Sequence, residues 1–282
     1  MKRLKHAAVT AWGLMLLAIF LLPPLVVLAG SFMSEIELEI GYFDTPRVQS
    51  LRLIPARFTL SQYAAALLGN TDYTRALQNT IQISVVSSVL AMLHALCAAY
   101  ALIFCRIPAK RGIIVLYLIL MILPYQALEM PQYLMLRELG LLGGHAAVIL
   151  TNCFGTFEGL ILAAFFQMIP QEQVEAAAMD GAGELRKLLL IVLPQMKQPI
   201  LMIWMLKLIQ VWNMTEQPIL FLDDTTLLPM SVMLRTLSAK FSEDSFAFAV
   251  VFSLPLLLLA WLVKDDSYFA ITTGRLKQEE SK

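Results

Sequence analysis

Long apolar runs alternate with shorter polar segments along the whole chain. Each run has roughly 20 residues, which is the length that an α-helix needs to cross the hydrocarbon core of a membrane. Most charged side chains lie between the runs or at the two ends of the chain. The pattern predicts an all-α membrane protein with six transmembrane helices, at about residues 7–30, 80–104, 112–136, 146–167, 199–220 and 245–263.

The positions of the basic residues predict the orientation of these helices. The first run follows a basic tip at residues 2–5, and the second run ends at Arg106, Lys110 and Arg111. Because Lys and Arg are enriched in cytoplasmic loops, we expect both termini in the cytoplasm. The first run is longer than the apolar part of an ordinary signal peptide, and no small-residue cleavage site follows it. It is therefore expected to remain as the first span.

Four parts follow from this topology. Residues 1–30 form a cytoplasmic tip and the first span, and residues 31–77 form an extracellular loop. In that loop, the sequence from Thr59 to Gln62 fits a capping box and predicts a short helix from Leu60 to Leu68. Residues 78–264 form a five-span core with a polar cytoplasmic loop at 168–198, and residues 265–282 form a cytoplasmic tail. Pro124 and Pro131 are expected to break the third span.

Composition narrows the class of protein. Hydrophobic residues make up 59% of the 282 residues and charged residues only 15%, which is typical of a membrane protein. The formal net charge is zero, so no general positive field favours nucleic acid. The three cysteines and three histidines have no metal-ligand spacing. We find no phosphate-binding loop and no catalytic arrangement, so we expect no catalytic residue, metal or cofactor in this chain.

The loop at 168–198 contains the most distinctive stretch of the sequence. Small, helix-favouring residues follow Pro170 and lead to Gly181, which can adopt the left-handed backbone conformation that ends a helix. A second helix is expected after this turn, with an apolar face of leucines and Val192. The stretch therefore predicts two short helices, joined by a turn, on the cytoplasmic side.

The spacing E-A-A-x-x-D-G-A followed by I-x-L-P resembles the cytoplasmic coupling loop of ABC importer permeases. The residues that match are Glu175, Ala176, Ala177, Asp180, Gly181, Ala182, Ile191, Leu193 and Pro194. In that family, the loop docks on a separate ATPase and transmits its closure to the membrane helices. Two residues depart from the pattern: Gly183 replaces a common capping Ser or Thr, and Leu188 replaces an aromatic residue.

Other segments resemble one branch of this family, the smaller, maltose-type permease of carbohydrate importers. They include Asn79-Thr80, the stretch 131–142, and Trp212-Asn213 followed by Pro218. The resemblance implies a multi-pass protein of the bacterial cytoplasmic membrane that works by alternating access and transports a carbohydrate. It implies as partners a second, different permease, two ATPase subunits that bind ATP and Mg, an extracellular solute-binding protein and the lipid bilayer.

Polar side chains inside the predicted spans are candidates for the transport pathway, because charged and amide groups are costly in hydrocarbon and need water, partners or substrate. Carboxylates and amides could hydrogen-bond the hydroxyl groups of a sugar. Alternatively, two of the acids lie near the outer interface, and Lys207 pairs with an acid inside the bundle. The candidates are Gln126, Glu129, Asn152, Glu158, Lys207, Gln210, Asn213 and Glu216.

Other functions remain as alternatives. The chain could be an ABC importer permease for a solute that is not a sugar. It could also be an ion-driven secondary transporter in which Glu158 and Lys207 relay ions, although we find no inverted repeat of the kind that many such transporters contain. A membrane enzyme is disfavoured because no catalytic constellation is present.

Overall fold

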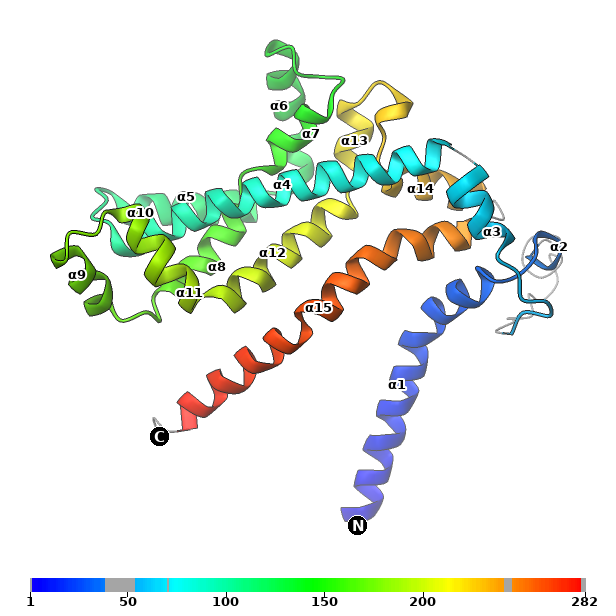
Figure 1. Ribbon diagram of the computed structural model, residues 1–282, viewed down its shortest axis with the longest axis horizontal. Coiled ribbons are helices and arrows are strands. Elements are labelled where there is room, and N and C mark those ends of the chain that lie inside the picture. The colour runs from blue at the N-terminus through cyan, green and yellow to red at the C-terminus, as the bar shows by residue number, and fades with distance from the viewer. Residues whose placement is uncertain (1, 39–53, 70, 241–244, 280–282) are drawn as a thin grey trace. The chain divides into compact units, whose positions relative to one another are not determined.

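The computed structural model describes residues 2–38, 54–69, 71–240 and 245–279, and these residues form helices and no strand (Figure 1). The helices before the loop of interest are α1 (Lys2–Gly30), α2 (Glu35–Leu38), α3 (Ser61–Ala64), α4 (Thr71–Phe104), α5 (Lys110–Ile122), α6 (Tyr125–Glu138), α7 (His145–Asn152) and α8 (Thr156–Phe166). After them come α9 (Gln171–Met179), α10 (Glu184–Lys187), α11 (Leu193–Gln195), α12 (Lys197–Trp212), α13 (Glu216–Phe221), α14 (Met230–Lys240) and α15 (Ser245–Glu279).

Several of these helices are suited to a membrane. Four are long and apolar enough to cross one: Val9–Gly30, Thr71–Phe104, His145–Phe166 and Ser245–Val263. Two further pairs qualify if each bent pair is taken as one span, namely Lys110–Ile122 with Tyr125–Glu138 and Glu184–Gln195 with Lys197–Trp212. The all-helical membrane class predicted from the sequence is therefore confirmed, with four to six candidate spans among the described residues.

The third apolar run is bent at one of its two prolines. The helices α5 and α6 meet at an angle of 101°. Pro124 stands between them in an extended conformation, with φ −63° and ψ 132°, and its ring removes the backbone donor that a continuous helix would need. Pro131 lies inside α6, so the expected break at that proline is wrong.

The chain divides into two compact units, residues 1–77 with 232–255, and residues 78–231 with 256–282. In the first unit, the buried side chain of Gln62 donates hydrogen bonds from Nε2 to the carbonyl oxygens of Gly30 and Met33, at 2.9 and 2.7 Å. The reciprocal half of the capping box predicted for Thr59, from Gln62 back to the N–H of Thr59, is therefore not formed, although Oγ1 of Thr59 accepts from the N–H of Ser61 at 3.1 Å. The backbone N–H of Thr59 donates to the carbonyl of Phe32 instead, and the α-helix is limited to Ser61–Ala64, followed by a π-helical turn at Ala65–Gly69.

In the second unit, α4 and α8 pack closely because their facing residues are small. Ala95 and Ala99 of α4 are fully buried, and a Cβ at Gly159 of α8 would lie only 3.7 Å from the Cα atom of Ala95. The same core includes large side chains of α8 and of the segment that follows α10, among them Leu162, Phe166 and Val192. This packing holds α8 between α4 and α12, and both functional regions described below belong to this unit.

Candidate functional site

The predicted pair of cytoplasmic helices is present as α9 and α10, which lie together with α11 in Figure 1. Pro170 is the N-cap residue of α9 rather than its first helical residue. Gly181 has φ +81°, as the sequence predicts for the turn. The N–H of Ala182 donates to the carbonyl of Ala177 at 2.9 Å, and the N–H of Gly181 donates to Ala178 at 3.0 Å. These two bonds form the Schellman motif that ends a helix at a left-handed residue.

Most of the residues that match the coupling loop are accessible. Glu175, Ala176, Asp180, Gly181 and Pro194 are exposed. The others are partly buried: Ala177, Ala182, Ile191 and Leu193. Large apolar side chains beside them also face outward, with exposed fractions of 88% for Met179, 67% for Leu185 and 64% for Leu190. An apolar surface of this kind on a polar loop is typical of a site where another protein binds.

The apolar face predicted for the second helix is divided. Leu188 and Val192 are buried in the core, whereas Leu185 and Leu189 are exposed, at 67% and 49%. The segment is also not one regular helix, since α10 ends at Lys187 and a π-helical turn, Leu188–Val192, follows. The wider turn changes the spacing at which side chains repeat on one face.

A three-residue contact joins this loop to α4. The hydroxyl of Tyr100 in α4 donates to Oε2 of Glu184 at 2.7 Å, and Nζ of Lys187 donates to Oε1 of the same carboxylate at 2.6 Å. Lys187 is buried, while the side chain of Glu184 is 62% exposed. The carboxylate therefore holds the start of α10 against α4.

Four of the predicted pathway residues surround one cavity. Asn152, Gln210, Asn213 and Glu216 line it together with Tyr125, Met214 and Thr215, and its volume is about 290 Å³. The cavity lies where helices are interrupted, since α12 ends at Trp212 and α13 begins at Glu216. Breaks of this kind place amide, hydroxyl and carboxylate groups around a space that apolar helices would otherwise fill. The wall is therefore rich in hydrogen-bonding groups.

A chain of buried and partly buried amides supports this cavity. Nδ2 of Asn152 donates to the side-chain oxygen of Gln217, and Nε2 of Gln217 donates to Oε1 of Gln132 at 3.3 Å. Gln217 is completely buried. Neither Gln132 nor Gln217 was predicted from the sequence, although Gln217 is an amide within an apolar run and could have been found by that signal.

Glu158 and Lys207 form a buried ion pair, which confirms that Lys207 pairs with an acid. Their side-chain atoms Oε1 and Nζ are 3.7 Å apart, and the side chains are 6% and 7% exposed. Lys207 Nζ also donates to Oε1 of Gln210 at 3.5 Å, which connects the pair to the cavity wall. A Cβ at Gly155 would lie 2.8 Å from Glu158 Oε2 and 2.9 Å from the carbonyl oxygen of Ala91, so glycine is required there.

The two remaining candidates differ in their surroundings. Gln126 is exposed and does not line the cavity. Glu129 is partly buried, and its Oε1 is a buried atom without a hydrogen-bond partner among the described residues. Glu129 interacts electrostatically with Glu216, which does line the cavity. One acid thus lines the cavity, and a second interacts with it from outside the cavity wall.

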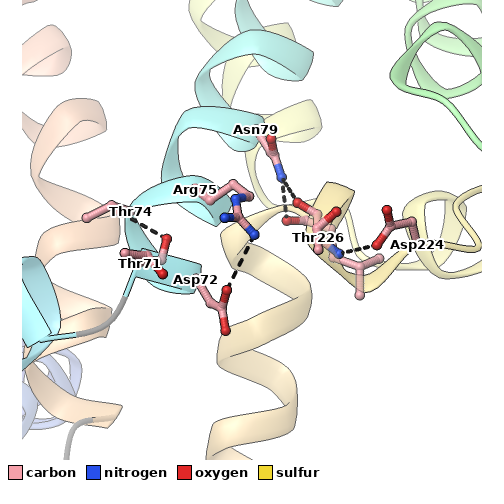
Figure 2. Close-up of polar contacts among 8 residues, drawn as sticks. Thr71, Asp72, Thr74, Arg75, Asn79, Asp224 and Thr226 are labelled. Atoms are coloured by element: carbon pink, nitrogen blue, oxygen red, sulfur yellow. Dashed lines mark hydrogen bonds and ion pairs between the residues drawn. The ribbon is translucent and has the colours of Figure 1, made fainter.

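The loop between α13 and α14 is fixed to α4 by two neighbouring polar residues. Nδ2 of Asn79 donates to the carbonyl oxygens of Thr226 and Leu228, at 2.9 and 3.2 Å (Figure 2). The hydroxyl of Thr80 accepts from the N–H of Met230 at 2.7 Å. Asn79 and Thr80, which the sequence analysis noted only as part of a resemblance, therefore have a structural role.

The features above define a membrane transport subunit: apolar helices, a polar cavity at helix breaks and an exposed helix pair that resembles a coupling loop. The chain belongs to the family described as binding-protein-dependent transport system inner membrane component, whose profile matches residues 91–264. The resemblance to ABC importer permeases is confirmed, and the chain is a permease component, not an enzyme.

Several known proteins are similar to this chain. Protein LplC of Bacillus subtilis is 29% identical over 222 residues, covering 77% of this chain and 70% of LplC. The polygalacturonan/rhamnogalacturonan transport system permease protein YtcP, also from Bacillus subtilis, is 28% identical over 237 residues and covers 83% of this chain and 78% of YtcP. The sn-glycerol-3-phosphate transport system permease protein UgpE of Rhizobium meliloti is 27% identical over 189 residues, covering 65% of this chain and 67% of UgpE.

A solved structure has the same fold. It is the crystal structure of a bacterial ABC transporter involved in the import of the acidic polysaccharide alginate. One of its chains superposes with a TM-score of 0.77, at 23% sequence identity, over 92% of this chain and 95% of that one.

Proposed function

We propose that this chain is one of two different permease subunits of an ABC importer for a carbohydrate. Its partners are a second permease, two ATPase subunits that bind ATP and Mg, and an extracellular solute-binding protein. The observation that carries the proposal is the helix pair α9 and α10, in which the family's coupling residues surround a left-handed glycine and an exposed apolar surface.

In this proposal, closure of the ATPase dimer moves α9 and α10, and the contact between Tyr100 and Glu184 passes the movement to α4. The polar cavity at Asn152, Gln210, Asn213 and Glu216 forms part of the pathway, which opens alternately to the two sides of the bacterial cytoplasmic membrane. The chain crosses that membrane six times, with both termini in the cytoplasm and the loop at 168–198 facing the ATPase.

Two observations support a carbohydrate as the substrate. The cavity wall offers amide, hydroxyl and carboxylate groups, which together can donate to and accept from the hydroxyl groups of a sugar. YtcP is named for transport of polygalacturonan and rhamnogalacturonan. A second candidate is a small phosphorylated polyol, because UgpE is named for transport of sn-glycerol 3-phosphate. Uptake of labelled galacturonides, neutral oligosaccharides and sn-glycerol 3-phosphate by the complete transporter separates these substrates.

Labelling from the two sides of the membrane tests the topology. In a variant without Cys97, Cys105 and Cys153, single cysteines at Asp224 and Arg186 sit at exposed positions. A membrane-impermeant thiol reagent should reach Asp224→Cys in intact cells and Arg186→Cys only after permeabilisation. External labelling at Arg186→Cys would contradict the proposal, because the coupling loop must face the ATPase.

A pair of amide variants tests the pathway. Gln210→Leu removes an amide from the cavity wall, whereas Gln126→Leu removes an exposed amide outside it. We expect Gln210→Leu to raise the substrate concentration needed for half-maximal uptake and Gln126→Leu to leave it unchanged. If both variants transport like the wild type, the cavity is not part of the pathway.

A further inference from the structure

Two neighbouring hollows lie along the seam where α5 packs against α8, and together they are called the groove below. One end of the groove is a cleft of about 550 Å³ between the end of α4, the start of α5 and the start of α9. The polar side chains that line this cleft are Lys110, Gln167 and Gln171, and no carboxylate lines it. The rest of its wall is apolar, with Leu102, Phe104 and Ile114 among its residues.

The other end of the groove is purely apolar. It has a volume of about 380 Å³, and Leu160 and Ala164 of α8 line both ends, so the two ends adjoin at these residues. Its wall includes Leu118 and Met121 of α5, and Phe157 of α8. These three large side chains are 41–45% exposed. The groove thus changes from polar to apolar along its length.

Positive charge is concentrated at the polar end. Lys110 lines the cleft, and Arg106 and Arg111 are its neighbours in sequence. None of these three side chains forms an ion pair with any residue in the part of the chain that the structure describes. The cleft is also lined by the first residues of α5 and α9, Lys110 and Gln171, and the N-terminus of a helix carries partial positive charge. This end is therefore suited to an anion.

We propose that this groove binds one anionic phospholipid, with its phosphate beside Lys110 and an acyl chain along α5 and α8. The inference rests on the proposed orientation, which places Arg106, Lys110 and Arg111 at the cytoplasmic surface of the membrane. Anionic lipids of the cytoplasmic leaflet are attracted to basic clusters at that position. The polar, positive end suits the phosphate of a phospholipid, and the apolar end suits its acyl chain. An acidic peptide would suit only the positive end.

The first test measures lipid retained by the purified full-length protein in a mild detergent, using native mass spectrometry. The probes are phosphatidylglycerol and the zwitterionic phosphatidylcholine, added separately. Lys110→Gln should lower the retained phosphatidylglycerol about fivefold, which is the contribution of one lysine near an anionic surface. The matched control is Lys197→Gln, which removes an exposed lysine that does not line the groove and should change nothing.

A second variant tests the apolar end without altering the charge. Ala164 is exposed on α8 and lines both ends of the groove, so Ala164→Trp should fill the path of the acyl chain. We expect it to lose bound phosphatidylglycerol while the thermal unfolding temperature in detergent stays within a few degrees of the wild type.

Three results would overturn the inference. They are equal retention of phosphatidylglycerol by Lys110→Gln and the wild type, equal binding of phosphatidylcholine and phosphatidylglycerol by the wild type, and a cross-link that places a helix of the partner permease in the groove. Lipid retention is measured without transport, so its failure is distinct from a failure of the proposed function, which the thiol-labelling experiment tests separately.

Discussion

The helix pair α9 and α10 and the polar cavity are held in shape by different kinds of contact. The turn after α9 depends on two hydrogen bonds between backbone atoms at most five residues apart. The cavity depends on side chains that are far apart in sequence, such as Asn152 with Gln217 and Glu158 with Lys207. A local backbone motif is thus enough to shape the candidate docking element, whereas a polar site inside a bundle needs contacts between helices.

The two regions should also differ in what a substitution costs. At the turn, most side chains are exposed, so a substitution changes the position of the loop more than the stability of the protein. At the cavity, removing one polar partner leaves another polar group buried and unpaired, which is costly. Substitutions in the two regions should therefore differ clearly in how much stability they remove.

The largest effect is expected at the buried ion pair. Lys207→Met removes the partner of Glu158 and should lower the free energy of unfolding by about 3–5 kcal/mol, because a buried charge is left uncompensated. Thermal unfolding in detergent measures the change. The double variant Lys207→Met with Glu158→Met should recover most of the loss. If Lys207→Met alone is as stable as the wild type, water reaches Glu158. The cavity region would then be no more sensitive to substitution than the turn at Gly181.

A smaller effect is expected in the chain of amides. Gln217→Leu leaves the amide groups of Asn152 and Gln132 without this partner and should cost about 1–3 kcal/mol. Asn152 retains its bond to the carbonyl of Val148, which limits the loss. The measurement is again thermal unfolding, with Gln126→Leu as the exposed control. Equal stability of the two variants would show that the amide chain does not support the cavity.

At the turn, Gly181→Val should uncouple transport with little loss of stability. No atom lies within 4 Å of a Cβ at this position, so the penalty comes from the positive φ and amounts to about 1–2 kcal/mol. The control Gly183→Ala also places a Cβ in open space, but there φ is −69°. Substrate uptake and stimulation of the ATPase should fall in Gly181→Val and remain normal in Gly183→Ala. Normal uptake in both variants would contradict the proposal that this turn couples ATP hydrolysis to transport.

The smallest effect on stability is expected for Tyr100→Phe. The variant keeps the aromatic ring and removes one hydrogen bond to Glu184, which should cost about 1 kcal/mol or less because Glu184 is largely exposed. If this contact transmits movement from α10 to α4, ATP hydrolysis should continue while uptake per ATP falls. Tyr117→Phe, on α5, serves as the control because, among the residues that the structure describes, the hydroxyl of Tyr117 forms no hydrogen bond to the loop. An unchanged ratio of uptake to ATP hydrolysis in Tyr100→Phe would exclude the contact as a transmission path.

The sequence predicted the local features well. The left-handed Gly181 and the two helices around it follow from short-range preferences, and the apolar runs follow from length and composition. The prediction from the sequence was wrong in part where a local motif competed with a contact between residues far apart in the chain. Thr59 to Gln62 fits a capping box, but Gln62 instead bonds the carbonyls of Gly30 and Met33 some thirty residues away.

The candidate site was predicted in part. Residues such as Asn213 and Gln210 were identifiable because amides are rare in apolar runs, but nothing in the sequence indicated which of them share a cavity. Gln126, which looks the same in the sequence, is exposed and does not line the cavity. Gln132 and Gln217 were missed because their role depends on the bend at Pro124 and the break after Trp212, which bring α6 and α13 together.

The ion pair between Glu158 and Lys207 also has a consequence for biosynthesis. The acid is translated first, and its partner follows about fifty residues later. A ribosome that adds about 5–20 residues per second separates the two by several seconds. During that interval, the carboxyl group of Glu158 on α8 lacks its ion-pair partner, Lys207. Insertion of this segment into the membrane therefore costs more free energy before α12 arrives than after it, which makes the order of synthesis part of how the bundle forms.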